Sequence, residues 1–197
     1  MEKAHEKTGY EKEIENKLNT NALKQLQHTE IENQQQQFPI TIVCDAIRTP
    51  ENIGMCFRIS ESFGVAKIYL HETSPTIENR IVKKTARNTL TQIAHERYTD
   101  FNETIAQLKA EGNTIIGIEI TDQSTHIQAF DFKACKKIVL LLGSERNGIQ
   151  HIDAVDKTVA IPMYGRNSSM NVIHSLSIAL YEATNQLKET QQTENAQ

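Results

Sequence analysis

Short runs of β-branched and aliphatic residues recur along the chain from Phe38 onward, and longer amphipathic segments separate them. Strands that alternate with helices in this way are typical of an α/β domain with a mostly parallel sheet and helices on both faces. The expected strands span residues 40–45, 67–70, 93–97, 114–120, 137–142 and 157–161. The expected helices span residues 52–63, 77–87, 101–111 and 171–187. We therefore predict one α/β domain over residues 38–187 of the 197-residue chain.

The last expected helix carries an apolar stripe at helical spacing, which predicts that it packs on the sheet. The stripe consists of Val172, Leu176, Ala179, Leu180, Ala183 and Leu187. Both ends of the chain are polar, and residues 34–37 are all glutamine. We expect a flexible or partly helical arm at residues 1–37 and a polar tail at residues 188–197 that frays.

No stretch of the sequence has the length and apolar character of a membrane span, and the first residues lack the apolar core of a signal peptide. We therefore expect a cytoplasmic protein. The three cysteines form no C-x-x-C pair and the seven histidines lack ligand spacing, so we expect neither disulfides nor a metal site. A net charge of −4 argues against non-specific coating of nucleic acid, so any RNA contact must use local patches.

The segment Pro50–Ser60 directly follows the first strand, and most of it belongs to an expected helix that is apolar nearly all round. Asn52 suits the N-cap position of this helix. Arg58 lies inside the helix, where a charged side chain is costly unless it has a partner or holds a phosphate. An arginine that extends to the surface explains this segment equally well.

The segment Ile138–Ile149 is predicted to be a buried strand that opens into a turn of small residues. Gly143 and Gly148 permit positive φ angles and let a ligand approach the backbone closely. The turn has neither the G-x-G-x-x-G spacing of a dinucleotide-binding loop nor the Lys-Ser/Thr pair of a P-loop. Taken alone, this segment is better explained as an ordinary connection between a strand and a helix.

The segment Ile161–Val172 begins at the carboxyl end of a strand and leads into the last helix. Loops at that end are where open α/β sheets bind ligands, so its polar residues are candidates for a binding site. Ser168, Ser169 and Asn171 also suit the cap of the helix, and capping is the better explanation for this segment alone.

Together, in this order and each after a strand, the three segments resemble the motifs of the SpoU (TrmH-type) family in the SPOUT superfamily of methyltransferases. The motif residues are Asn52-x-Gly54-x-x-x-Arg58, then Leu142-Gly143-Ser144-Glu145-x-x-Gly148, then Ile161-Pro162-Met163 through Ser169-Met170-Asn171-Val172. The joint match is specific, and the resemblance covers roughly residues 38–187.

The resemblance implies a sheet whose carboxyl-terminal segment threads a loop to form a deep trefoil knot, which is a rare topology. It also implies a homodimer with its active site at the subunit interface. The implied cofactor is S-adenosyl-L-methionine, held bent in the knot with backbone groups around its adenine. The residues at the matching cofactor positions are Ile118, Glu119, Leu142, Gly143, Ile161, Met170 and Asn171.

The activity implied by the resemblance is attack of an RNA ribose 2′-oxygen on the methyl group of the cofactor. Arg58 stands where the family places an arginine beside this hydroxyl, often with an RNA phosphate. Because a guanidinium gives up its proton only with great difficulty, we expect Arg58 to stabilise the developing alkoxide and anchor phosphate, with the route of the proton left open. The residues expected to orient Arg58, the ribose and the cofactor are Asn52, Glu145, Ser169 and Asn171.

The chain departs from the family pattern at a few positions. Arg146 stands where glycine is usual, and Asn88-Thr89 where a Gly-Ala pair is common, so we expect an altered RNA-facing surface. His174 replaces a small residue in the last helix, which predicts different packing against the knot or the partner subunit. None of these changes removes a residue that the chemistry needs.

Basic residues outside the motifs are further candidates for RNA contacts. A possible phosphate-binding stripe on one helix face consists of Arg80, Lys83, Lys84 and Arg87. A solvated basic face is the commoner meaning of such a cluster, and Arg48, just before the first motif, is the better candidate by position. Transfer RNA is slightly favoured over ribosomal RNA as the substrate, because no separate folded RNA-binding domain is evident.

Other function classes fit the sequence less well. A non-catalytic RNA-binding or assembly module with the same fold is the strongest alternative, but the intact motif residues argue against it. A nicotinamide oxidoreductase would need the glycine fingerprint and its acidic ribose-binding partner. A serine hydrolase would need a G-x-S-x-G motif, and the sequence has none.

Overall fold

The structure is a computed structural model, and it describes residues 23–27, 30–31 and 35–194 of the chain. The chain divides into two compact units, Met1–Gln35 and Gln36–Gln197. In the first unit, Lys24 Nζ lies 2.6 Å from Glu30 Oε1 in an ion pair. The arm expected at residues 1–37 lies for the most part outside the described residues.

The second unit is built on a seven-stranded sheet with the order β3-β2-β1-β6-β4-β7-β5. Its strands are β1 (Phe38–Cys44), β2 (Val65–His71), β3 (Ala94–Tyr98), β4 (Thr114–Ile118), β5 (Thr125–His126), β6 (Ile138–Leu142) and β7 (Lys157–Ala160). Every neighbouring pair is parallel, which confirms the predicted kind of sheet, and each predicted strand overlaps an observed one. The sequence does not predict β5, because two residues are too few to show alternation.

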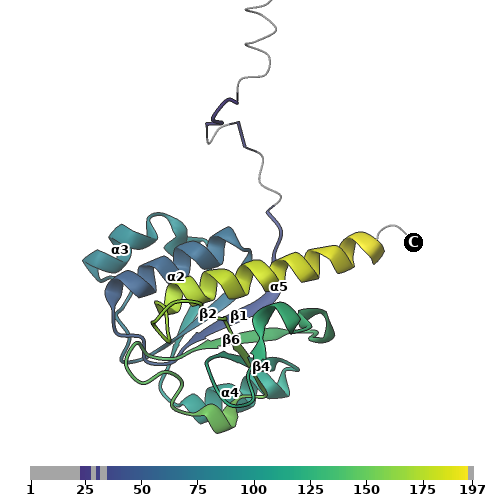
Figure 1. Cartoon of the computed structure of the whole chain (residues 1–197). Coiled ribbons are helices and arrows are strands. Elements are labelled where there is room, and N and C mark those ends of the chain that lie inside the picture. Colours follow the sequence, from purple (N-terminus) through teal and green to yellow (C-terminus); the bar gives the residue numbers. More distant parts are fainter. Residues whose placement is uncertain (1–22, 28–29, 32–34, 195–197) are drawn as a thin grey trace, which may run out of the picture. The chain divides into compact units, whose positions relative to one another are not determined.

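Helices cover both faces of the sheet (Figure 1). One face carries α2 (Pro50–Ser62), α3 (Arg80–Ala86) and α5 (Val172–Glu194), and the other carries α4 (Phe101–Ala110). Short 3-10 helices lie in the connections: η2 (Thr89–Thr91), η3 (Ile127–Ala129), η4 (Phe132–Ala134) and η5 (Ile152–Ala154). Within the described ranges, no helix has the length and apolar character needed to cross a membrane.

Helix α5 is longer than the sequence predicts. It continues to Glu194, whereas the apolar stripe ends at residue 187, so the first part of the expected polar tail is helical. Once packing has fixed the preceding turns, each added residue gains a helical hydrogen bond, and Lys, Glu and Gln have good helix propensity. Residues 195–197 lie outside the described residues.

Alternate residues of the central strands face two separate apolar layers. Along β1, Ile42 and Cys44 belong to the core under α2 and α5, whereas Val43 belongs to the core under α4. The predicted stripe of α5 is confirmed, with fully buried Leu176, Ala179, Leu180 and Ala183 and partly buried Val172 and Leu187. All of β6 is buried, so the loop that follows it starts from a firmly packed strand.

Two cysteines that are separate in sequence lie together in this core. Cys44 Sγ on β1 is 3.8 Å from Cys56 Sγ on α2, and both are free thiols. The hydrogen bond to Cys56, with burial, raises the pKa of Cys44 well above its usual value, so Cys44 packs as a neutral thiol. No cluster of three or more His, Cys, Asp or Glu side chains within the described part of the chain is arranged to hold a metal ion.

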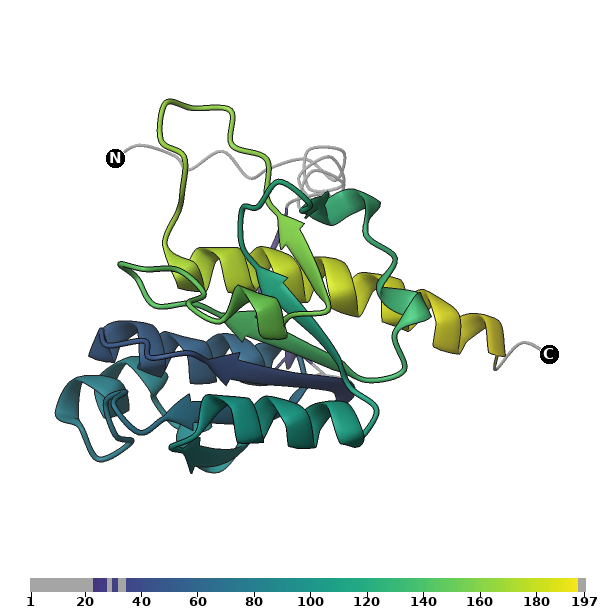
Figure 2. The same cartoon turned by 90° about the horizontal axis from the view of Figure 1, so that it is seen from below.

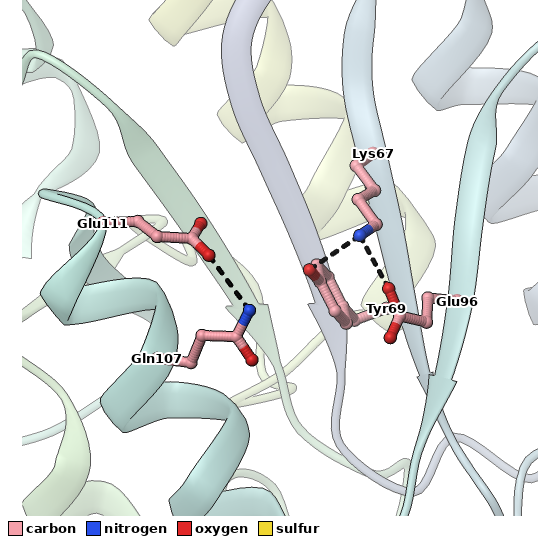
Figure 3. Close-up of polar contacts among 5 residues, drawn as sticks. All are labelled: Lys67, Tyr69, Glu96, Gln107 and Glu111. Carbon is pink, nitrogen blue, oxygen red and sulfur yellow. Dashed lines mark hydrogen bonds and ion pairs between the residues drawn. The ribbon is translucent and has the colours of Figure 1, made fainter.

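A hollow of about 460 Å³ lies at the amino-terminal edge of the sheet, between the end of α4 and the starts of β1, β2 and β3. On one wall, Lys67 Nζ donates hydrogen bonds to Tyr69 Oη (2.8 Å) and Glu96 Oε2 (2.7 Å); on the other, Gln107 Nε2 donates to Glu111 Oε1 (3.0 Å) (Figure 3). Burial lowers the pKa of Lys67, but its bonds to Glu96 and Tyr69 outweigh burial and raise this pKa overall. The charges of Lys67 and Glu96 are therefore paired with each other.

Candidate active site

A pocket with a volume of about 260 Å³ lies at the opposite edge, where the carboxyl ends of β4, β6 and β7 meet. Its walls come from residues 118–120, from residues 143–146 and 148, and from parts of the segment 159–175. Figure 2 shows the long loop of this last segment leaving β7 and returning to the start of α5. The fold thus brings the second and third sequence segments together at the edge where open α/β sheets bind ligands.

Most of the residues predicted to bind the cofactor line this pocket. They are Ile118, Glu119, Gly143, Ile161 and Met170. Leu142 is the buried last residue of β6, and Asn171 lies between the lining residues Met170 and Val172 without lining the pocket itself. The sequence did not single out Ile120, Val159, Ala160 or Ser175, which also line it.

The turn after β6 needs its two glycines for different reasons. A Cβ at Gly143 would collide with the backbone of Gly148 and Ile149. Gly148 has a φ of 62°, and a Cβ there would collide with the carboxylate of Glu119. The turn is closed by two backbone hydrogen bonds of 3.0 Å between Ser144 and Gly148. The chain therefore folds back sharply and leaves the pocket wall without a side chain at residue 143.

Glu119 fastens this turn to the end of β4. Its Oε2 accepts a hydrogen bond from the backbone N–H of Ile149 (3.1 Å), and its Oε1 accepts one from Ile120 (2.9 Å). Both oxygens are thus already used by backbone donors, so Glu119 shapes the pocket wall as well as lining it.

Glu145 joins the second motif to the first. Its Oε1 accepts hydrogen bonds from the backbone N–H of Thr49 (3.0 Å) and from Asn52 Nδ2 (2.8 Å), and its Oε2 accepts one from the backbone N–H of Arg48 (3.2 Å). Partial burial alone would raise the pKa of Glu145, but the hydrogen bonds from these donors outweigh burial and lower this pKa to about 2. The side chain is therefore a carboxylate at neutral pH.

Asn52 and Asn171 extend this network to the third motif. Asn171 Nδ2 donates a hydrogen bond of 3.1 Å to Asn52 Oδ1, and Asn171 Oδ1 accepts one of 2.8 Å from the backbone N–H of Ile173 in the first turn of α5. The prediction that Asn52 caps α2 is wrong. Helix α2 has Thr49 at its N-cap and starts at Pro50, which suits the first helical position, so the buried Asn52 lies inside the first turn.

Ser169 lines the pocket together with Ser168. Arg58, in contrast, does not line the pocket of its own chain. It lies half-buried midway along α2, and its guanidinium forms no hydrogen bond or ion pair with any described residue. A single chain thus assembles Asn52, Glu145, Ser169 and Asn171, but not Arg58.

The other basic residues predicted to contact RNA are exposed and lie away from the pocket lining. Arg48 is in the loop between β1 and α2, and the basic stripe is on α3 and its C-cap, as Arg80, Lys83, Lys84 and Arg87. Their exposure fits both an RNA-binding and a solvated face.

The three departures differ in their surroundings. Thr89 is buried and its Oγ1 donates a hydrogen bond of 2.7 Å to the carbonyl of Ala86, while Asn88 beside it is exposed. His174 is exposed on α5. Arg146 is exposed and lines the pocket, which makes it the departure closest to the candidate site.

Comparison with known proteins identifies relatives of this chain. Residues 39–181 match the SpoU rRNA Methylase family. The chain is 28% identical over 167 residues to the 23S rRNA (guanosine-2′-O-)-methyltransferase RlmB of Vibrio parahaemolyticus, covering 83% of this chain and 66% of that protein. It is 27% identical over 150 residues to RlmB of Escherichia coli, covering 75% and 60%. The chain thus spans less than two thirds of the length of these curated relatives.

Solved structures share the fold. The TrmH/SpoU tRNA modifying enzyme of A. aeolicus superposes with a TM-score of 0.71 at 23% identity, covering 79% of each chain. The SpoU methyltransferase AviRb of Streptomyces viridochromogenes, in complex with the cofactor AdoMet, gives a TM-score of 0.68 at 23% identity, covering 74% of this chain and 57% of that one. The family predicted from three short motifs is confirmed over most of the chain: this protein belongs to the SpoU rRNA Methylase family.

Proposed function

We propose that this chain transfers a methyl group from S-adenosyl-L-methionine to a ribose 2′-hydroxyl of ribosomal RNA. The observation that carries the proposal is the network of Glu145, Asn52 and Asn171, which joins all three family motifs beside one pocket. The sequence slightly favours transfer RNA, but the names of the RlmB relatives support ribosomal RNA instead.

The walls of the pocket suit this cofactor. Ile118, Ile161 and Met170 supply the apolar surface that an adenine ring needs, and the hydroxyls of Ser168 and Ser169 supply polar contacts. The bound cofactor would supply an electrophilic methyl group. The side-chain-free wall at residue 143 lets a ligand reach the main chain.

The residues of the network are suited to position the reactants and not to accept a proton. A ribose hydroxyl is a poor nucleophile until its proton is withdrawn. Glu145 is a poor base for this step, because its pKa is about 2 and both of its oxygens already accept hydrogen bonds. Glu145 therefore holds Asn52 and the loop at residues 48–49, while Arg58 stabilises the developing alkoxide and anchors phosphate.

A homodimer would bring Arg58 of one subunit to the pocket of the other. Because Arg58 does not line its own pocket, Arg58 of the partner subunit would complete each site. Helix α5 exposes Ile178 (38%) and Tyr181 (63%), one turn apart, which is apolar surface of the kind that two-fold interfaces bury. The likeness to TrmH/SpoU structures also supports the expected trefoil knot. The match of residues 39–181 to the family supports a methyltransferase domain at residues 38–187, and we propose that the arm at 1–37 and the residues from 188 lie outside it.

The decisive experiment incubates the protein with methyl-labelled S-adenosyl-L-methionine and either unmodified 23S rRNA or transfer RNA, and then maps the modified ribose. We expect label in 23S rRNA. Arg58→Ala is expected to lower transfer by about 100-fold or more while largely keeping cofactor affinity. Equal activity in this variant would contradict the role of Arg58. RNA binding without any cofactor binding would favour the non-catalytic module instead.

Mixed dimers test which subunit supplies Arg58. Arg58→Ala and Asn171→Ala chains, each impaired alone, are co-expressed with different tags and purified as heterodimers. If Arg58 acts across the interface, one of the two pockets has both residues intact, and transfer returns to about half of the wild-type rate. If Arg58 acts within its own chain, both pockets stay damaged and no activity returns.

A further inference from the structure

Arg146 is an unpaired cation in the wall of the pocket. It is exposed, and its guanidinium forms no hydrogen bond or ion pair with any residue in the described ranges. The neighbouring carboxylate of Glu145 does not satisfy it, because that carboxylate bonds Arg48, Thr49 and Asn52. A free guanidinium beside a ligand pocket is suited to hold an anionic group such as phosphate.

The loop between β7 and α5 carries a second guanidinium that has no partner among the described residues. Met163 and Ser168 line the pocket, and the residues between them belong to the same loop without lining it. Among these, Tyr164 is 94% exposed and Arg166 is exposed without a hydrogen bond or ion pair to the described residues. A Cβ at Gly165 would have no neighbour within 4 Å, so the space around this loop is open. An aromatic ring this exposed contributes nothing to the core.

One exposed aromatic ring and two guanidinium groups without a partner among the described residues, on the pocket wall and on the loop that follows β7, match the chemistry of a nucleotide. Bases stack on exposed aromatic rings, and phosphates bind arginine. With a net charge of −4, the chain can attract RNA only through local groups of this kind. We call Arg146, Tyr164 and Arg166 the pocket rim.

We propose that the pocket rim binds the RNA nucleotide that carries the target ribose, with Arg146 and Arg166 on its flanking phosphates and Tyr164 stacked on its base. This inference rests on the proposed methyl transfer and adds the residues that place the substrate.

The first test measures binding of an unmodified 23S rRNA transcript to the protein loaded with S-adenosylhomocysteine, over a range of KCl concentrations. Arg146→Gln and Arg166→Gln are each expected to weaken binding about fivefold and to make the salt dependence less steep by about one charge. Lys136→Gln is the matched control, because Lys136 is exposed at the other end of β6 and its loss should leave affinity nearly unchanged.

The second test separates base stacking from charge. Tyr164→Ala is expected to raise the KM for RNA about tenfold with little change in kcat, whereas Tyr164→Phe keeps the ring and should stay within about twofold of wild type. Calorimetric titration with S-adenosyl-L-methionine should give the same affinity for all of these variants.

Each outcome has a distinct meaning. Absence of methyl transfer by the wild type would refute the proposed function. The pocket rim would then have no target ribose to position, so the rim proposal would fail with it. An active wild type with rim variants indistinguishable from Lys136→Gln would overturn the rim proposal alone. If Arg146→Gln weakens cofactor binding but leaves RNA binding intact, Arg146 holds the carboxylate of the cofactor, and its assignment to RNA is wrong.

Discussion

Replacing the carboxylate of Glu145 should reveal how strongly the first and second motifs are joined. In Glu145→Gln, Arg48 and Thr49 lose a charged acceptor for their backbone N–H groups. The pKa of Glu145 falls from 4.5 to about 2 on folding, which corresponds to about 3 kcal/mol if counted in full. Because the side chain is exposed, solvent screening reduces this to about 1 kcal/mol.

The effect should depend on pH in a defined direction. The pKa is lower in the folded state, so Glu145 contributes its full stabilisation above the unfolded value of 4.5 and loses it as the pH falls toward about 2. Urea unfolding followed by circular dichroism should therefore show wild type about 1 kcal/mol more stable than Glu145→Gln at neutral pH, with a smaller gap near pH 3.

Glu61→Gln provides the control for this experiment. Glu61 is an exposed acid on α2 without a side-chain hydrogen bond to the described residues, so its substitution should change the free energy of unfolding by less than about 0.5 kcal/mol at either pH. A gap between wild type and Glu145→Gln that stays constant with pH would refute the reasoning, because the charge of Glu145 would then not hold the loop.

Two further predictions concern the turn after β6 and the basic stripe of α3. Gly143→Ala should destabilise the fold by about 1–3 kcal/mol, because the added Cβ would collide with backbone that cannot move aside. Gly165→Ala is the control, because a Cβ there has no neighbour within 4 Å and the change should be nearly neutral. Thermal unfolding compares the two variants, and equal stability would contradict the close approach at Gly143. Charge reversal at Lys83 and Lys84 should weaken RNA binding and lower its salt dependence. Unchanged filter binding at low and high KCl would instead identify the stripe as a solvated face.

The arrangement of strands and helices could be predicted because it follows from the local spacing of apolar residues along the sequence. The apolar runs that become β1, β6 and β4 are long enough to show their period, and the stripe of α5 marks its buried face. The end of α5 escaped prediction because residues beyond 187 have helix propensity but no apolar stripe. The periodicity of apolar residues locates the buried face of a helix, but it cannot show where a helix ends once the helix extends into solvent.

The candidate site was only partly predictable, because its contacts join residues that are distant in sequence. Motif resemblance identified Asn52, Glu145 and Asn171, but the hydrogen bonds from Asn52 to Glu145 and from Asn171 to Asn52 depend on the fold. The neighbouring position of Cys44 and Cys56 and the pocket contact of Ser175 likewise depend on strand order and helix packing.

Asn171 illustrates that helix capping and site formation are not competing explanations in this chain. Its Oδ1 caps α5 by accepting from Ile173, and the same side chain donates through Nδ2 to Asn52. The cap fixes the position of the amide group, and the fixed amide in turn orients Asn52 toward Glu145. Any substitution of Asn171 must therefore disturb the start of α5 and the junction of the three motifs together, because one rigid amide serves both.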